Sequence, residues 1–176
     1  PREAQVWPSG LVAIAQMVSV WLARTRFRLR LRCQIIHGDV HPFNVLVAQD
    51  GRVSGIIDFG DMVRTPLVCD LAVACSYQVA SQPGGDPLAR FVTFAAAYHA
   101  VLPLTKAERA ALFDLTAARM VTTVAIASWR AARHPENAPY ILRNFPSAQA
   151  GLTAFATLDR ATVAQALKDA LPLEAS

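Results

Sequence analysis

The segment IIHGDVHPFNVLVAQDGRVSGIIDFGD, from Ile35 to Asp61, most constrains what this chain can fold into. Four aspartates, two histidines and one asparagine interrupt runs of Ile, Val and Leu. Two apolar, β-branched runs, at residues 44–48 and 53–57, flank Asp50-Gly51, a dipeptide that favours a tight hairpin turn. A hairpin here would bring Asn44, at its start, beside Asp58, at its end. The sequence therefore predicts a β-hairpin with polar side chains gathered at its open end.

The rest of the chain is predicted to be mainly helical, because apolar residues recur at helical spacing. Asp86 precedes Pro87 as a helix cap with a proline at the first position. Thr105 and Glu108 have the spacing of a capping box, and His134-Pro135 ends that helix. The predicted helices span residues 11–23, 67–79, 87–102, 105–132, 147–157 and 159–171.

These predictions give an α+β, mainly helical domain in three parts. Residues 1–34 form a leading helix and a connector, residues 35–61 form the hairpin and the loop before it, and residues 62–176 form a helical body. A length of 176 residues is typical of one domain. Hydrophobic residues make up 53% and charged residues 17% of the chain, which predicts a real core and some apolar surface for a partner or second domain.

Composition also argues against several classes of protein. The longest apolar run is broken by Gln16 and Ser19 and is too short to span a membrane. No cleavage pattern follows Pro1, so we expect no signal peptide. The three cysteines lack zinc-site spacing, and we expect reduced thiols in a cytoplasmic protein. They are Cys33, Cys69 and Cys75.

An alternation of arginines precedes the hairpin, at Arg24, Arg26, Arg28, Arg30 and Arg32. One interpretation is a nucleic-acid-binding stripe, since phosphate binding uses clustered basic residues. The other is a solvated strand face or an extended connector. Beyond Phe27 no aromatic platform accompanies the arginines, so the second interpretation is favoured and no nucleic-acid partner is expected.

The polar residues of the hairpin form two motifs that agree in order and spacing. His37, Asp39 and Asn44 give H-x-D-x-x-x-x-N, and Asp58-Phe59-Gly60 follows after the hairpin. Kinase catalytic loops and their metal-binding motif have this order. Phosphoryl transfer needs a group that orients and deprotonates the acceptor hydroxyl, a task for Asp39. It also needs hard oxygen ligands for magnesium, a task for Asn44 and Asp58. The alternative is a hairpin with ordinary turn acids.

The stretches HGDVHPFNVLV and GIIDFGD resemble the aminoglycoside phosphotransferase and choline kinase family, whose members are relatives of protein kinases. Asp70-Leu71-Ala72 also resembles that family, and IIDFGDMVRTPLVCDLAVA is most similar to its hydroxylysine-kinase-like branch. The resemblance implies the C-terminal lobe of a protein-kinase-like fold. It also implies transfer of the γ-phosphate of ATP or GTP, with Mg²⁺, to a hydroxyl of a small, amine-bearing molecule such as an aminoglycoside, an amino alcohol or a hydroxylysine-like compound.

The resemblance assigns roles residue by residue. Asp39 matches the catalytic base, and Asn44 and Asp58 match the magnesium ligands. His37 and Asp70 match residues that support the catalytic loop, Asp70 by accepting hydrogen bonds from it.

Other polar residues are weaker candidates. His41 is a candidate for contacting phosphate or acceptor, although a loop-stabilising role is favoured. Asp61 is a candidate for the metal shell or for a cationic substrate, against a role in closing the turn. Three acids are candidates for contacting a cationic acceptor: Asp86, Asp114 and Glu136.

The sequence departs from the family before the catalytic loop. No G-x-G-x-x-G is present, and Lys106 and Lys168 lie far downstream, so we expect a C-terminal lobe whose N-terminal lobe is missing. The isolated chain is then expected to be inactive, with an exposed apolar surface at the hairpin where the missing lobe or a second copy would pack. The alternative function is a non-catalytic binding or scaffold module that keeps the loop for stability.

Overall fold

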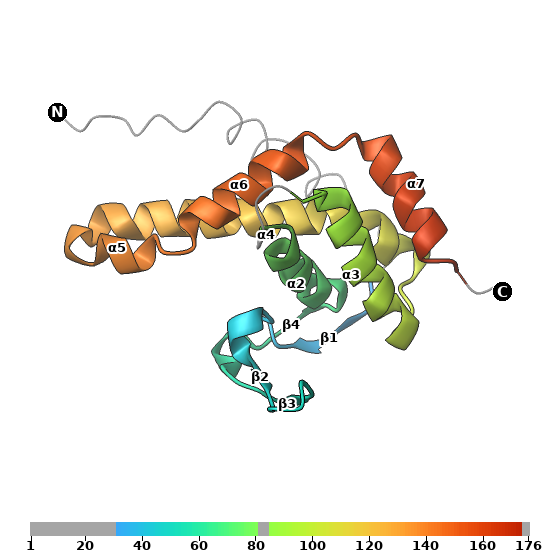
Figure 1. Cartoon of the computed structure of the whole chain (residues 1–176), viewed down its shortest axis with the longest axis horizontal. Helices are drawn as coiled ribbons and strands as arrows, with labels where there is room; N and C mark the ends of the chain where they lie inside the picture. Colours follow the sequence, from blue (N-terminus) through green and yellow to red (C-terminus); the bar gives the residue numbers. More distant parts are fainter. Residues whose placement is uncertain (1–30, 81–84, 174–176) are drawn as a thin grey trace.

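The structure of the chain, a computed structural model, describes residues 31–80 and 85–173. The predicted helix at 11–23 and the arginines from Arg24 to Arg30 lie outside the described residues. Two short antiparallel strand pairs lie beside a bundle of helices (Figure 1). The strands are β1 (Cys33–Ile36), β2 (Val45–Val47), β3 (Val53–Ile56) and β4 (Val63–Pro66). The helices are α2 (Val68–Ala80), α3 (Pro87–Val101), α4 (Lys106–Arg133), α5 (Ala138–Ile141), α6 (Phe145–Ala156) and α7 (Arg160–Ala170).

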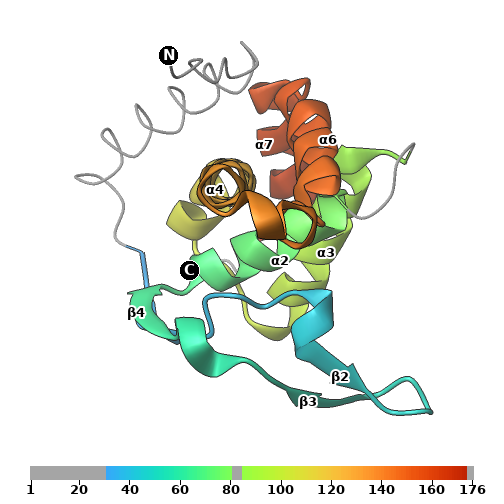
Figure 2. The same ribbon diagram turned by 90° about the vertical axis from the view of Figure 1, so that its left-hand side faces the viewer.

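The helical body is built around α4, which Figure 2 shows nearly end-on beside α2 and α6. Its core is apolar and includes stacked rings, with the centroids of Phe113 and Phe155 4.4 Å apart. The predicted helices of the described region are confirmed to within one or two residues. Their caps are confirmed too. Asp86 accepts a hydrogen bond from the Leu88 amide, and Thr105 and Glu108 form a reciprocal capping box.

The predicted hairpin is confirmed as β2 and β3, with Val45 opposite Ile56 and a bulge after Leu46. The turn between them closes where the Gly51 amide donates to the Ala48 carbonyl. Two strands on its flanks were not predicted as such. The residues that lead into the predicted catalytic loop (residues 37–44) form β1, and the residues before α2 form β4, which pairs with β1. Each strand has four residues, too few for a clear alternation, and their pairing is non-local.

The face around the hairpin carries many exposed apolar side chains, and the hairpin extends away from the helical body (Figure 2). Burying such groups is favourable by about 25 cal/mol for each Å² removed from water, so this surface is suited to a covering partner. What covers it stays a prediction. The exposed residues are Ile35, Phe43, Leu46, Val47, Val53, Ile56, Ile57, Phe59, Met62 and Val63.

Among the described helices, α4 is long and apolar enough to cross a membrane, by length and composition alone. Within the fold several of its apolar residues lie in the core, among them Leu112, Met120 and Val124, whereas Ile126 and Trp129 are exposed. Helix α4 also carries Glu108, Asp114 and Arg119, and each forms an ion pair with another element. These contacts are typical of the central helix of a folded domain.

The three cysteines are unpaired in the structure, and their reduced state in the cell stays a prediction. Cys33 is exposed, whereas Cys75 is fully buried in the helical core. Burial raises the pKa of the Cys75 thiol because the thiolate would lose its hydration there. Cys75 therefore acts as a small apolar core residue.

One ion pair ties the segment before β1 to α4. Arg32 donates from Nε to Glu108 Oε1 at 2.9 Å and from Nη2 to Glu108 Oε2 at 2.7 Å, and Glu108 is fully buried. Arg32, the described member of the arginine alternation, is thus a packing residue rather than a fully solvated one. Burial by itself raises the pKa of Glu108, but the hydrogen bonds from Arg32 and Thr105 outweigh it and hold the pKa below 4.5.

Replacing Arg32 by methionine is expected to lower the free energy of unfolding by about 2–4 kcal/mol at pH 7, because Glu108 is left buried without its cation. A carboxyl with a depressed folded-state pKa stabilises the fold above its unfolded pKa and loses that contribution as pH falls through the folded value. The difference in the free energy of unfolding between wild type and variant should therefore become smaller at acid pH. Denaturant unfolding across pH measures this, with the exposed Arg52→Met as the control. A gap that does not depend on pH would contradict the assignment.

Candidate active site

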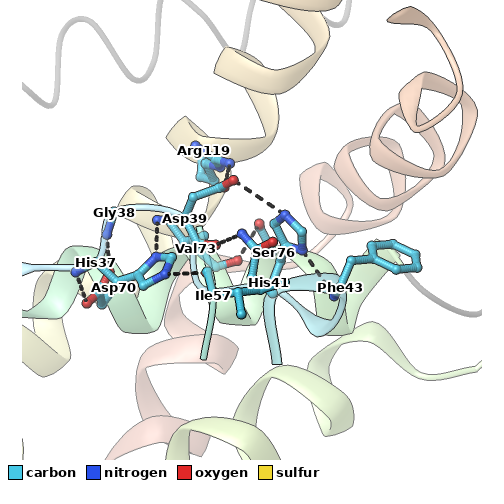
Figure 3. Close-up of polar contacts among 11 residues, drawn as sticks. His37, Gly38, Asp39, His41, Phe43, Ile57, Asp70, Val73, Ser76 and Arg119 are labelled. Atoms are coloured by element: carbon cyan, nitrogen blue, oxygen red, sulfur yellow. Dashed lines mark hydrogen bonds and ion pairs between the residues drawn. The ribbon is translucent and has the colours of Figure 1, made fainter. Parts of the chain in front are cut away.

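Asp70, in the first turn of α2, holds the start of the catalytic loop by both carboxylate oxygens (Figure 3). The backbone amide of His37 donates to Oδ2 at 3.0 Å, and that of Gly38 donates to Oδ1 at 2.8 Å. Bonds to an ionised acceptor are among the stronger hydrogen bonds in proteins. Helix α2 therefore fixes the position of the loop before it reaches Asp39.

The His37 ring connects the catalytic loop to the end of β3. Its Nδ1 accepts from the Asp39 amide at 3.3 Å, so Nε2 carries the proton and donates to the Ile57 carbonyl at 3.0 Å. The ring is buried and lies 4.9 Å from the Phe59 ring, centroid to centroid. Because both nitrogens are engaged, His37 positions the residues on either side of it and is not free to transfer protons.

Gly38 lies where a side chain would meet backbone. Its φ is +84°, a conformation that L-residues rarely adopt, and an added Cβ would collide with the carbonyl oxygen of Asp61. Glycine at this position lets the catalytic loop pass directly against the turn that follows Asp58.

Gly38→Ala is expected to displace the loop from the Asp58 turn. The left-handed conformation costs a non-glycine residue roughly 1–2 kcal/mol, and the backbone contact adds to that. The full-length protein should lose both stability and activity, measured by thermal unfolding and by turnover. Gly51→Ala is the matched control, because Gly51 has a similar φ of +82° but open space around it. An equal loss of activity in both variants would show that the Asp61 contact is unimportant.

Asp39 lies between a cation and a histidine. Its Oδ1 forms an ion pair with Nη2 of Arg119 on α4, and its Oδ2 lies 3.4 Å from Nε2 of His41 (Figure 3). The Asp39 side chain is 20% exposed, enough to be reached by an acceptor. The sequence analysis missed Arg119. The available signal was an arginine within the apolar stretch of a long core helix.

Asn44 and Asp58 are joined through the hairpin. The buried Asn44 side chain donates from Nδ2 to the Asp39 carbonyl at 3.0 Å, and the Ile57 amide donates to the Asn44 carbonyl at 3.0 Å. These contacts engage the Nδ2 and the carbonyl of Asn44 but not its Oδ1, the candidate ligand atom, and Asp58 directly follows Ile57, the backbone partner of Asn44. That their side-chain oxygens converge on one ion stays a prediction.

Asp58 has φ +65° and ψ +65°, and it is the one described non-glycine residue with a positive φ. Strained backbone of this kind is concentrated at functional sites. The described residues contain no cluster of three or more His, Cys, Asp or Glu side chains able to hold a metal. An amide oxygen with one carboxylate nonetheless suits Mg²⁺, which takes oxygen ligands and fills its shell with water and substrate phosphates.

The weaker candidates have structural contacts. His41 Nδ1 accepts from the Phe43 amide at 3.1 Å and caps the turn at Pro42–Asn44. The side chain of Asp61 is exposed within the turn at Phe59–Asp61. Asp86 caps α3, Asp114 is paired with Arg160, and Glu136 lies 3.5 Å from His134. None of the last three lines a pocket that is bordered by Pro42 and Phe43 of the predicted catalytic loop.

That pocket has a volume of about 310 Å³ and lies between the catalytic loop, α2, α4 and α6. The ring of His41, the neighbour of Asp39, lies 4.8 Å from that of Tyr77 and 5.8 Å from that of Phe43, centroid to centroid, and both of these residues line the pocket. The pocket is lined by Pro42, Phe43, Ser76, Tyr77, Met120, Thr123, Asn144, Ser147 and Ala148.

A protein-family model described as the phosphotransferase enzyme family matches residues 2–106, more than half of the chain. The chain belongs to this family. The match includes the catalytic loop, the hairpin and α2, which carry the motifs and contacts described above. Membership implies a kinase-like fold, consistent with the mainly helical body and small strand pairs.

Similar proteins include small-molecule kinases. Hydroxylysine kinase of Mus musculus is 35% identical over 121 residues, covering 61% of this chain and 30% of that protein. Hydroxylysine kinase of Danio rerio is 33% identical over 112 residues, covering 61% and 31%. Homoserine kinase of Gluconacetobacter diazotrophicus is 39% identical over 105 residues, covering 60% and 31%. The aligned region thus spans about a third of the length of these relatives.

Proposed function

We propose that the full-length protein transfers the γ-phosphate of ATP or GTP to a hydroxyl group of a small, amine-bearing molecule. Hydroxylysine and homoserine, the substrates that the relatives' names give, are the first acceptors to test. The hydrogen-bond network that joins Asp39, His37, Asn44 and Ile57 carries the proposal. It connects the half-buried Asp39 to Asn44, and Asp58, the other candidate for metal binding, directly follows Ile57 in the chain.

In the proposed reaction, the acceptor hydroxyl donates its proton to Asp39 as its oxygen bonds to the γ-phosphorus. The bond between that phosphorus and the β-phosphate oxygen breaks, and the nucleoside diphosphate leaves. Asn44 and Asp58 would hold magnesium, which supplies charge neutralisation on the phosphates when bound. His37 and Asp70 hold the loop in place, so Asp39 is already positioned before the acceptor binds and no further loss of conformational entropy is needed to order it.

The pocket beside the loop is the proposed acceptor site. Its lining residues Phe43 and Tyr77 pack against His41, which lies beside Asp39, and a general base must come within hydrogen-bonding reach of the proton that it removes. Phe43 and Tyr77 contribute aromatic rings to its lining, and ring faces attract ammonium groups. No carboxylate lines the pocket among the described residues, so these rings are the groups that would attract the amine of the acceptor.

We propose further that the remainder of the protein covers the apolar surface at the hairpin and holds the nucleotide, and that the protein acts in the cytoplasm. Positioning of the phosphoryl group requires contacts on both sides of the nucleotide. The 176-residue chain by itself is then expected to show no measurable kinase activity. Turnover by the purified chain at roughly 1–100 per second, the usual range for kinases, would contradict this.

A screen of acceptors tests the proposed function. The full-length protein is incubated with ATP or GTP, Mg²⁺ and one acceptor at a time, and nucleotide consumption is measured. The panel contains hydroxy amino acids, amino alcohols, aminoglycosides and sugars. Consumption that depends on one class of acceptor supports the proposal. A protein that binds nucleotide but consumes none with any acceptor would instead be a binding or scaffold module.

A further inference from the structure

We propose that Arg119 binds a carboxylate of the acceptor, which makes the substrate a short hydroxylated amino acid or hydroxy acid rather than an amino alcohol, aminoglycoside or sugar. This inference rests on the proposed function and specifies the substrate class of the same site. It begins from the contact between Arg119 and the proposed base.

Arg119 reaches Asp39 from α4 and contacts it with one terminal nitrogen, Nη2 (Figure 3). Its Nε is buried and has no hydrogen-bond partner among the described residues. A guanidinium carries five N–H donors in a planar fork that matches a carboxylate in two parallel hydrogen bonds. The single Nη2 contact to Asp39 therefore leaves donors of Arg119 for a second anion.

The Arg119 contact also occupies the atom that catalysis needs. Asp39 Oδ1 is paired with Arg119, and Oδ2 lies beside His41 at 3.4 Å. A base must present a free oxygen to the acceptor hydroxyl. An acceptor carboxylate that pairs with Arg119 in place of Asp39 would free Asp39 Oδ1 to accept the proton of the acceptor hydroxyl. Binding of the correct substrate would therefore also make the base available. An acceptor without a carboxylate offers Arg119 no such exchange.

The charges around the pocket agree with an anionic group on the acceptor. None of the nine lining residues is acidic or carries a permanent positive charge, so a cationic contact for the acceptor has to come from a residue beside the lining, such as Arg119. It directly precedes Met120, a lining residue, and its carbonyl accepts from the hydroxyl of Thr123, another lining residue. Asp39 is assigned to the acceptor hydroxyl, so it is not the group that would bind another part of the acceptor.

The distance between the two groups limits the size of the acceptor. Arg119 and Asp39 are in direct contact, so the carboxylate and the reacting hydroxyl must approach neighbouring side chains. A chain of a few carbons between the two groups meets this requirement. The pocket volume of about 310 Å³ is at the lower end of the range for small-molecule sites, which also favours a small substrate.

Matched acceptors test the inference in the full-length protein. Hydroxylysine and homoserine are each compared with the amine that remains when the carboxylate is removed. We expect wild-type kcat/KM to favour the carboxylate member of a pair by roughly 10- to 100-fold, the factor for charge-assisted hydrogen bonds. Arg119→Met should abolish this preference, mainly through KM, and Arg119→Lys should keep part of it. Arg130→Met, at an exposed position of α4, is the control and should keep the full preference.

A purely structural Arg119 would give a different result, because Arg119→Met would then lower kcat/KM for both members of a pair by the same factor. Such an equal loss would overturn the inference and leave the proposed kinase function standing. The same conclusion would follow from a better rate with the carboxylate-free members, or from turnover confined to aminoglycosides, amino alcohols or sugars. No turnover with any acceptor, despite nucleotide binding, would overturn both. Thermal unfolding of each variant shows whether it is folded when its preference is measured.

Discussion

Asp39→Asn in the full-length protein is expected to lower kcat by roughly 10²–10⁴-fold, the effect typical of losing a general base. The fold should survive, because the amide has nearly the same shape and its oxygen still accepts a hydrogen bond from Arg119. Nucleotide binding should change little, because Asp39 is assigned to the acceptor hydroxyl and not to the metal. Steady-state kinetics and nucleotide titration measure the two properties separately.

Asp50→Asn is the matched control for this substitution. It makes the same chemical change in the turn of the same hairpin, where Asp50 is exposed and contacts Arg52. Its kcat should equal that of wild type. If Asp39→Asn also kept wild-type turnover, Asp39 would not be the base and the proposed mechanism would be wrong.

Asp58→Asn is expected to weaken magnesium-dependent nucleotide binding as well as turnover. Asparagine is one of the few residues that tolerate the left-handed conformation of Asp58, so the backbone of this turn should be preserved. Any loss of magnesium-dependent binding can then be attributed to the missing negative charge of the Asp58 carboxylate. We expect the Mg²⁺ concentration for half-maximal activity to rise by more than about 10-fold, since even outer-shell changes at metal sites cost that much.

The comparison between the two aspartate variants separates their roles. Asp39→Asn should keep the wild-type Mg²⁺ dependence with a low kcat, whereas Asp58→Asn should shift the Mg²⁺ dependence. Unchanged magnesium dependence in Asp58→Asn, measured with Asp50→Asn alongside, would remove Asp58 from the metal site.

Local chemistry made much of the fold predictable. Asp50-Gly51 marked the hairpin turn, Asp86-Pro87 marked the start of α3, and Thr105 with Glu108 marked the start of α4. Each signal acts through neighbours in the chain, so it can be read without tertiary information. The motif residues from His37 to Asp58 were assigned from their order and spacing along the chain, and their catalytic and metal-binding roles stay predictions.

Contacts between distant segments were not predictable. The pairing of β1 with β4 joins short strands on either side of the hairpin, and Arg32 contacts Glu108, which lies 76 positions further along the chain. Arg119 lies 80 positions from Asp39 in sequence, in a helix whose pattern indicates only a core. No local rule selects that partner. Among the acids suggested for a cationic acceptor, Asp86 is the helix cap that the sequence also predicted, whereas the pairing of Asp114 with Arg160 was not foreseen.

The most direct test of the central claim is transfer of labelled γ-phosphate from ATP to an acceptor by the full-length protein. The reaction is run with Mg²⁺ and hydroxylysine or homoserine, and the product is analysed for a phosphate ester on the acceptor hydroxyl. We expect labelled ester from wild type with Mg²⁺, and strongly reduced ester from Asp39→Asn or after chelation of the metal. Label that appears only as free phosphate, or ester formed equally well by Asp39→Asn, would contradict the account.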